Sequence, residues 1–269
     1  MRLAVGVEYD GTAYAGWQSQ PTVDSIESQV RRALAAVADH AVEVTCAGRT
    51  DAGVHALCQV AHFDASAARS ERAWVLGANT QLPPDIALLW ARPVPQSFHA
   101  RYSATARSYR YLIVNRPMRP ALARLRAHFV HHPLDEQAMN FAAQFLVGEH
   151  DFTSFRSSEC QSRTPVRRIE RISVARQSEF VLIEVTANAF LHHMVRNIAG
   201  VLLRVGIGEA PPGWVREVLG ERDRTRAGVT APAQGLYLHS VAYAPQFELP
   251  AAVAVETGLS SMIPPHVLV

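Results

Sequence analysis

The fold is decided by the stretch RLAVGVEY at residues 2–9, in which every second residue is Leu, Val, Val and Tyr. An apolar period of two indicates a half-buried β-strand. Apolar residues then recur at helical spacing over residues 26–37, which predicts an amphipathic helix. Asp24, with Glu27 three positions later, resembles a capping box and predicts where that helix begins.

The same patterns extend through both halves of the chain. The first half adds strands at 42–46, 54–63 and 86–90 and a helix at 71–78. Strand, helix, strand, strand, helix, strand is the order of a ferredoxin-like split βαβ unit. The second half repeats much of it, with strands at 107–114, 166–175, 180–188 and 236–243 and helices at 135–147, 190–205 and 214–219.

Two similar halves predict an α+β protein in a pseudo-twofold arrangement, with a cleft between the two sheets. We expect an N-terminal subdomain at 1–105, a C-terminal subdomain at 106–245, and a tail of unknown role at 246–269.

Composition excludes several classes of protein. The 269 residues are 48% hydrophobic with a formal net charge of +2, which excludes an intrinsically disordered chain. Cys46, Cys58 and Cys160 are too few for a disulfide scaffold, and none forms a Cys-x-x-Cys pair. The longest uncharged stretch, residues 227–247, contains prolines and glycines and is too polar to span a membrane. With no secretory signal either, we expect a cytoplasmic protein.

Charge is unevenly distributed along the chain. All 26 basic residues are arginine, and residues 101–176 hold 13 of them against 6 acids, a local net charge of +7. Guanidinium groups bind phosphates through a bidentate fork and stack on bases. A biased codon usage explains the absence of lysine but does not explain the clustering, so we favour a polyanionic partner such as a nucleic acid.

One loop carries the strongest chemical signal. Residues 46–55 read CAGRTDAGVH, in which two glycines bracket Arg-Thr-Asp between two predicted strands. A carboxylate beside an arginine stays ionised, and suits a nucleophile or an electrostatic stabiliser better than a general acid. From the spacing alone an ordinary hairpin turn is the favoured explanation of the loop.

Further motifs turn this loop into a recognisable pattern. With GRTDAGVH at 48–55, the chain resembles the tRNA pseudouridine synthases of the TruA kind. The other matching motifs are EYDG at 8–11, GWQ at 16–18, FHAR at 98–101, ATARSYRY at 104–111, DFTSFR at 151–156, CQSRTP at 160–165, HHMVRN at 192–197 and GLYL at 235–238.

This resemblance implies an activity and a partner. The family isomerises uridine to pseudouridine at positions 38, 39 and 40 of the tRNA anticodon stem and loop. It is an isomerase of the intramolecular transferase type that needs no cofactor. The resemblance also implies two α/β subdomains around a central basic cleft, and a homodimer that grips one tRNA.

The resemblance assigns roles to five residues. Asp51 matches the catalytic aspartate, a nucleophile, and Arg49 matches the residue associated with base flipping. Tyr109 matches the tyrosine that contacts the flipped uracil, and Leu236 an apolar residue on the opposite face of the base. Arg196 is implied to pair with Asp51 and orient it. Taken alone, a loop salt bridge, a strand aromatic and a core leucine would explain Arg49, Tyr109 and Leu236.

Two segments are expected to bind tRNA. Their residues are Phe98, His99, Ala100, Arg101 and Tyr102, and Glu159, Cys160, Gln161, Ser162 and Arg163. Further arginines are expected to contact phosphates, which positions a substrate without reading its sequence. They are Arg107, Arg110, Arg124, Arg126, Arg167 and Arg168.

His192 and His193 are predicted to be structural, through helix capping or a core hydrogen bond. Neighbours on a helix point in different directions, which makes a poor metal pair, so we expect no metal.

Two other functions compete with the synthase reading. A non-catalytic RNA-binding protein would have no need for the set Arg49, Asp51, Tyr109 and Arg196. A glycosidase acting on free nucleosides would need a second carboxylate as general acid, and the sequence near Asp51 supplies no strong candidate.

Overall fold

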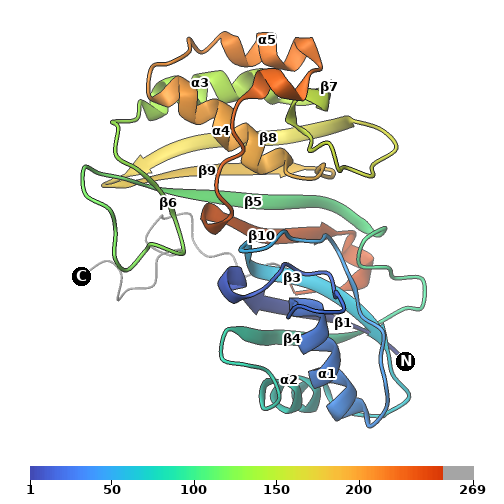
Figure 1. Ribbon diagram of the computed structural model, residues 1–269. Coiled ribbons are helices and arrows are strands. Elements are labelled where there is room, and N and C mark those ends of the chain that lie inside the picture. The colour runs from blue at the N-terminus through green and yellow to red at the C-terminus, as the bar shows by residue number, and fades with distance from the viewer. Residues whose placement is uncertain (251–269) are drawn as a thin grey trace. The chain divides into compact units, whose positions relative to one another are not determined.

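The computed structural model describes residues 1–250 and divides into two compact units (Figure 1). The first contains Met1–Ala106 together with the described residues from Tyr237 onward, and the second contains Arg107–Leu236. The subdomains expected from the sequence placed the strand at 236–243 in the second half. It belongs instead with the first unit, where it pairs with a strand of that unit. Most of the expected tail, residues 251–269, lies outside the described residues.

The first unit is a sheet with two helices. Its strands lie in the order β4-β1-β3-β10, with β1 antiparallel to both β3 and β4. The short β2 is antiparallel to β3, and β10 is parallel to it. The order of elements predicted for the first half of the chain is confirmed. The bounds of the elements in this unit are β1 Arg2–Tyr9, α1 Ile26–Ala38, β2 Thr45–Cys46, β3 His55–Asp64, α2 Glu71–Asn79, β4 Ile86–Val94 and β10 Leu236–Tyr243.

The predicted start of α1 is wrong by one residue. Ser25, not Asp24, is the N-cap, and its hydroxyl accepts a hydrogen bond from the backbone N of Ser28 at 3.3 Å. The Ser28 hydroxyl completes the capping box. With Ser25 as N-cap, Glu27 is not the third residue of the helix, and its carboxylate accepts the backbone N–H of Ser19 at 2.7 Å.

The second unit is a mostly antiparallel sheet with three helices. Its strands lie in the order β5-β9-β8-β7, all antiparallel, and β6 pairs in parallel with β5. The helices pack on one another, and α3 packs on β8 (Figure 1). The bounds are β5 Ala104–Asn115, β6 His128–Val130, α3 Glu136–Ala143, β7 Gly148–Asp151, β8 Val166–Gln177, β9 Phe180–Ala187, α4 Met194–Gly206 and α5 Trp214–Glu221.

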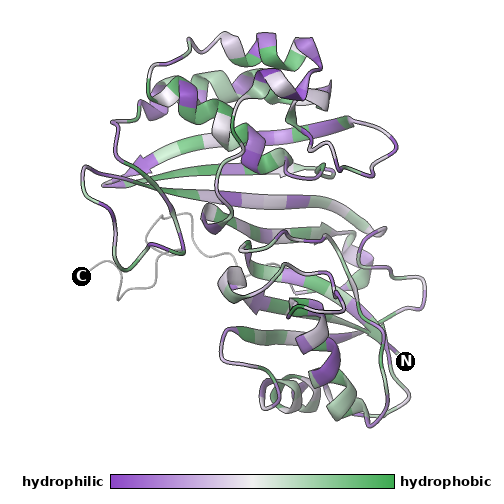
Figure 2. Cartoon of the chain, in the orientation of Figure 1, coloured by the Kyte–Doolittle hydropathy of each residue, from purple (hydrophilic) through white to green (hydrophobic). Residues whose placement is uncertain are grey.

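Burial along the strands follows their position in the sheet. Hydrophobic and hydrophilic residues alternate along β8, of which Ile169, Ile172 and Val174 are buried (Figure 2). The neighbouring β9 is buried at all but one position, as expected for a central strand.

Within residues 1–250, every helix is too short or too polar to cross a lipid bilayer.

The helix predicted at 190–205 begins at Met194 in the structure, four residues after its predicted start. Phe190 lies before the helix, and α4 starts at Met194 because His193 adopts a left-handed backbone conformation with φ of 62°. A left-handed residue cannot continue an α-helix, so the chain turns at this point.

Candidate active site

The loop at residues 47–54 joins β2 to β3 and carries Asp51. It closes as a tight turn, in which the backbone N of Val54 donates to the carbonyl oxygen of Asp51 at 3.1 Å. Gly53 takes a φ of 75°, a conformation that glycine adopts without strain. Arg49 is exposed and Asp51 is half-buried.

Hydrogen bonds hold this loop on both sides of Arg49. The hydroxyls of Tyr9 and Thr50 share a hydrogen bond of 2.8 Å, and the backbone N of Trp17 donates to the Thr50 carbonyl at 3.0 Å. The buried side-chain amide of Gln59 donates to the Gly48 carbonyl at 2.6 Å. The loop that carries the predicted nucleophile is therefore fixed by residues distant in the sequence.

Two glycines let another segment of the chain approach this loop closely. A Cβ atom on Gly11 would lie 2.0 Å from the carbonyl oxygen of Val54. Gly16 has a φ of 96°, and a Cβ there would lie 2.6 Å from the Thr50 carbonyl oxygen. Only glycine fits at either position, because the colliding atoms belong to the backbone. This contact explains why the GRTDAGVH motif occurs together with EYDG and GWQ.

An acid–imidazole pair lies behind the loop. Nδ1 of the buried His55 lies 3.0 Å from the carboxylate of Asp10, and the ring stacks on Tyr237 at a centroid distance of 4.7 Å. Thr12 donates to the same carboxylate through its backbone N and its hydroxyl. The hydrogen bond with His55 holds the pKa of the Asp10 carboxyl well below its ordinary value of 3.8, so we assign Asp10 a structural role.

This pair predicts a pH-dependent contribution to stability. Asp10→Asn is expected to lower the free energy of unfolding by about 1–2 kcal/mol at neutral pH, because a charge-assisted hydrogen bond is lost. A carboxyl whose pKa is lowered by folding contributes fully above its unfolded pKa, and the contribution is lost as the pH falls through the folded value. Urea unfolding of both proteins should therefore show a constant difference from about pH 7 to pH 5, shrinking below about pH 4. A difference that persists unchanged at low pH would contradict this assignment.

The second unit carries Tyr109 on β5. Its ring is buried and meets the edge of Phe190 at 5.0 Å and 81°. Tyr111 lies two residues along on the same face, as the sequence predicts, and its hydroxyl donates to the Pro232 carbonyl at 2.9 Å.

Arg196 and Leu236 are linked to β5 by the segment at 231–236. Nε of Arg196 donates to the carbonyl of Ala231 at 2.8 Å, and the Ala231 backbone N returns a hydrogen bond to the Arg196 carbonyl at 3.1 Å. A Cβ on Gly235 would lie 2.8 Å from the carbonyl oxygen of Leu112 on β5. The segment therefore packs against both α4 and β5, and the buried Leu236 lies at its end.

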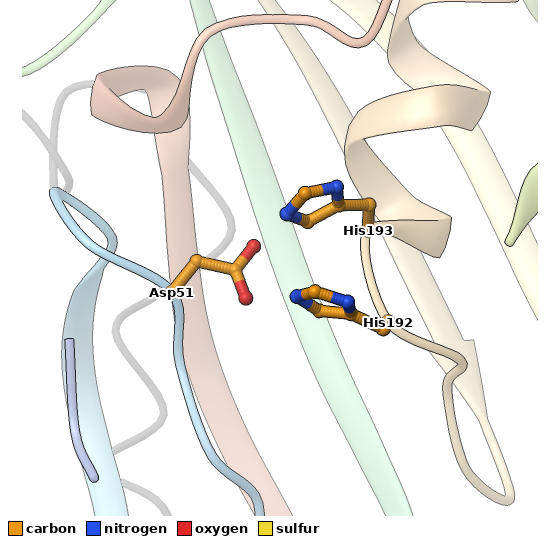
Figure 3. A group of neighbouring side chains, drawn as sticks. All are labelled: Asp51, His192 and His193. Carbon is orange, nitrogen blue, oxygen red and sulfur yellow. The ribbon is translucent and has the colours of Figure 1, made fainter. Parts of the chain in front are cut away.

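The side chains of His192 and His193 were predicted to point in different directions, and they do not. Their rings lie side by side, with centroids 4.0 Å apart and planes at 37° (Figure 3). The expectation assumed that both residues are helical, whereas they precede α4, and the side chain of His193 does not cap that helix. Paired imidazoles can bind a metal ion or an anion, chemistry that the prediction of divergent rings set aside.

Two residues predicted to touch tRNA are instead buried. Phe98 and Ala100 are both 0% exposed. Phe98 packs against Tyr243 and Phe247 at centroid distances of 5.1 and 5.0 Å. The backbone N of Ala100 donates to Nδ1 of His62, whose pKa burial lowers to about 4, so the ring stays neutral and can accept. Both side chains hold the segment in place, and the contact of this segment with tRNA stays a prediction.

Their neighbours form an exposed aromatic and cationic surface. Tyr102 is 78% exposed, and the Arg101 guanidinium lies 5.7 Å from its ring centroid. His99 packs beside Tyr102 at 4.3 Å, and its Nδ1 accepts the backbone N–H groups of Arg101 and Tyr102. An aromatic ring beside a guanidinium offers stacking to a base and charge to a phosphate.

The second predicted contact segment, residues 159–163, lies in a surface loop shaped by Arg167. The guanidinium of Arg167 donates to the Ser162 hydroxyl at 2.7 Å and to the Thr164 carbonyl at 3.0 Å. Arg167 thus shapes the loop.

Arg110 is 3% exposed and bonded to Glu184 at 2.8 Å, so its predicted phosphate contact is wrong.

Comparison with known proteins decides the family. The model of the tRNA pseudouridine synthase family matches residues 6–103 and 142–244 of this chain. The chain belongs to the tRNA pseudouridine synthase family. Its matched ranges contain Arg49, Asp51, Arg196 and Leu236, whereas Tyr109 lies between them.

Relatives of this synthase family are similar over nearly the whole chain. Proteins named tRNA pseudouridine synthase A from Coxiella burnetii and Methylococcus capsulatus are each 57% identical over 249 residues, which is 93% of this chain and 95% and 92% of the relatives. The protein of that name from Hydrogenovibrio crunogenus is 51% identical over 254 residues, covering 94% of this chain and 97% of the relative. The resemblance drawn from the sequence motifs is confirmed.

Proposed function

We propose that this protein isomerises uridine to pseudouridine in tRNA. The observation that carries the proposal is a carboxylate, Asp51, on a surface loop held at Gly48 and Thr50 by buried partners. This loop lies within the range that matches the synthase family. A loop anchored in this way suits a side chain that must act from a fixed position.

The reaction breaks the N1–C1′ glycosidic bond, turns the uracil and joins C5 to C1′, after which C5 loses its proton and N1 is protonated. Positive character builds at the sugar as that bond breaks, as it does in glycoside hydrolysis. The carboxylate of Asp51 meets this need as the nucleophile. A paired uridine must first leave its stack, which costs a few kcal/mol. The exposed Arg49, two residues before Asp51, fills the vacated space and holds the phosphate.

The second unit supplies the binding of the base. In this proposal the ring of Tyr109 stacks against the uracil, Leu236 packs on the opposite face, and Arg196 pairs with Asp51 and orients it. The aromatic surface of Arg101 and Tyr102 and the loop at 159–163 then grip the tRNA backbone. The net charge of +7 over residues 101–176 supports an anionic partner on this part of the chain.

Finer features of the proposal follow the family resemblance. We place the target uridines at positions 38, 39 and 40 of the anticodon stem and loop. We also propose a pseudo-twofold pair of α/β halves around a central basic cleft, a homodimer that grips one tRNA, and action in the cytoplasm.

The test is direct. An unmodified tRNA transcript incubated with the purified protein is expected to gain pseudouridine, which carbodiimide labelling locates in the anticodon arm. Binding without any label would support the non-catalytic RNA-binding reading, and release of free uracil would support a glycosidase. Either result would refute the proposal.

Salt should weaken the complex strongly. If several arginines replace counterions on tRNA, affinity is expected to fall at least tenfold between about 50 and 200 mM salt. Arg101→Ala should reduce the slope of log affinity against log salt by about 1. Arg92→Ala is the matched control, because Arg92 pairs with Glu71 outside the basic region and its loss should leave the slope unchanged. Affinity independent of salt, measured by filter binding, would rule out an arginine-rich binding surface.

A further inference from the structure

Thr50, the residue before Asp51, is unusually constrained for a loop residue. It is 7% exposed, and its hydroxyl and its carbonyl oxygen both have partners. The hydroxyl shares a hydrogen bond with Tyr9 at 2.8 Å, and the carbonyl accepts the backbone N–H of Trp17 at 3.0 Å. The charged residues on either side of Thr50, Arg49 and Asp51, are by contrast at least partly exposed.

Tyr9 reaches the loop from the end of β1. It is 3% exposed, and its ring packs against Trp17 at a centroid distance of 5.9 Å. The two hydroxyls are 41 residues apart in sequence, so their contact ties the loop to the central part of the sheet. A buried hydroxyl left without a partner costs about 1–3 kcal/mol, which keeps this contact formed.

This contact restricts where the Asp51 carboxylate can lie. The Thr50 carbonyl is part of the peptide group that precedes Asp51, and its bond with Trp17 fixes the plane of that group. The bond from Val54 to the Asp51 carbonyl fixes the next peptide group. The side chain of Thr50 is a further point at which the loop is held, through its hydrogen bond with Tyr9.

We propose that the buried hydroxyl pair of Tyr9 and Thr50 sets the position of the Asp51 carboxylate for the reaction. Both are positioning residues, since they act through the backbone of Asp51 and do not touch the substrate. The inference rests on the proposed synthase activity. Displacing a reacting group by about 1 Å can cost on the order of a hundredfold in rate, so small shifts of the loop should be measurable.

The experiment measures single-turnover rates and tRNA affinities of hydroxyl variants. Tyr9→Phe and Thr50→Val each remove one hydroxyl and keep the shape of the side chain. Each should lower the rate of pseudouridine formation by about 10–100-fold, with tRNA affinity within about twofold of wild type. Thr50→Ser retains the hydroxyl and should restore the rate to within about threefold of wild type. The double variant should be no slower than the slower single variant, because both changes remove the same bond.

Ser70→Ala separates positioning from a general loss of stability. Ser70 caps α2 in the same unit, accepting the backbone N of Ala73 at 3.2 Å, and its loss costs about 1 kcal/mol. We expect a lower melting temperature with an unchanged rate for this control. If Tyr9→Phe does not fold, the comparison of Thr50→Val with Thr50→Ser carries the test alone.

Two outcomes would overturn the inference, and they are distinguishable. An active wild type whose hydroxyl variants keep the full rate, or lose rate only together with tRNA affinity, would refute positioning and leave the synthase activity intact. A wild type that forms no pseudouridine would refute the proposed function and the positioning role together.

Discussion

Asp51→Asn is expected to abolish pseudouridine formation while tRNA binding persists. The amide has nearly the same size as the carboxylate but carries no charge and cannot act as the nucleophile. Loss of a central catalytic group costs roughly 10³-fold or more in rate. The loop should survive the change, because its turn is closed through the Asp51 carbonyl and is held at Thr50. Carbodiimide labelling of tRNA measures the activity, and filter binding measures the affinity.

A matched acid-to-amide change guards this result against a nonspecific effect. Asp39 is an exposed carboxylate in the same unit, at the end of α1, with a φ of 59° that asparagine tolerates. Asp39→Asn should therefore retain wild-type activity. Full activity in Asp51→Asn would refute the assignment of the nucleophile, whatever the control shows.

Gly11→Ala is expected to destabilise the first unit by about 3 kcal/mol, through overpacking against backbone that cannot move aside. The new methyl carbon would lie 2.0 Å from the carbonyl oxygen of Val54 and 2.7 Å from its carbonyl carbon. Val54 closes the turn around Asp51, so the collision should also lower activity in molecules that remain folded. Thermal denaturation gives the loss of stability, and single-turnover kinetics give the loss of rate.

Gly220→Ala is the matched control, because a Cβ at that position in α5 meets nothing within 4 Å. Alanine stabilises a helix relative to glycine by up to about 1 kcal/mol, so this variant should melt at the same temperature or higher. Equal melting temperatures for Gly11→Ala and wild type would show that the loop and the segment at 10–17 are not in rigid contact.

Much of the fold could be predicted from the sequence, because local periodicity reflects which face of an element is buried. The strand at 2–9 and the helices at 26–38 and 71–79 agree with the predicted ranges within two residues. The strands at 128–130 and 148–151 were missed, since runs of three and four residues show no period. The long-range pairing of the strand at 236–243 has no local signal at all.

Part of the candidate site could likewise be predicted from the sequence, and part could not. The GRTD loop is a local pattern and could be located without a structure, as could the basic region. The partnership of Tyr9 with Thr50 could not, because it depends on how β1 and β3 pair across the sheet. Tyr9 lies in the EYDG motif at residues 8–11, but the motif does not indicate which group the Tyr9 hydroxyl contacts. The burial of Phe98 and Arg110 is equally invisible locally, since each occurs in a segment that also contains exposed residues.

The pairing of β10 with β3 has a consequence for how the chain is made. Tyr237 lies opposite His55, so β10 can join the edge of β3 beside the GRTD loop only after the residues between them have been synthesised. During translation that edge stays open while some 180 further residues emerge, and contacts of such wide sequence separation form slowly. An unpaired edge is also a template for aggregation. The nascent chain therefore passes through a vulnerable interval, which ends when β10 pairs with β3.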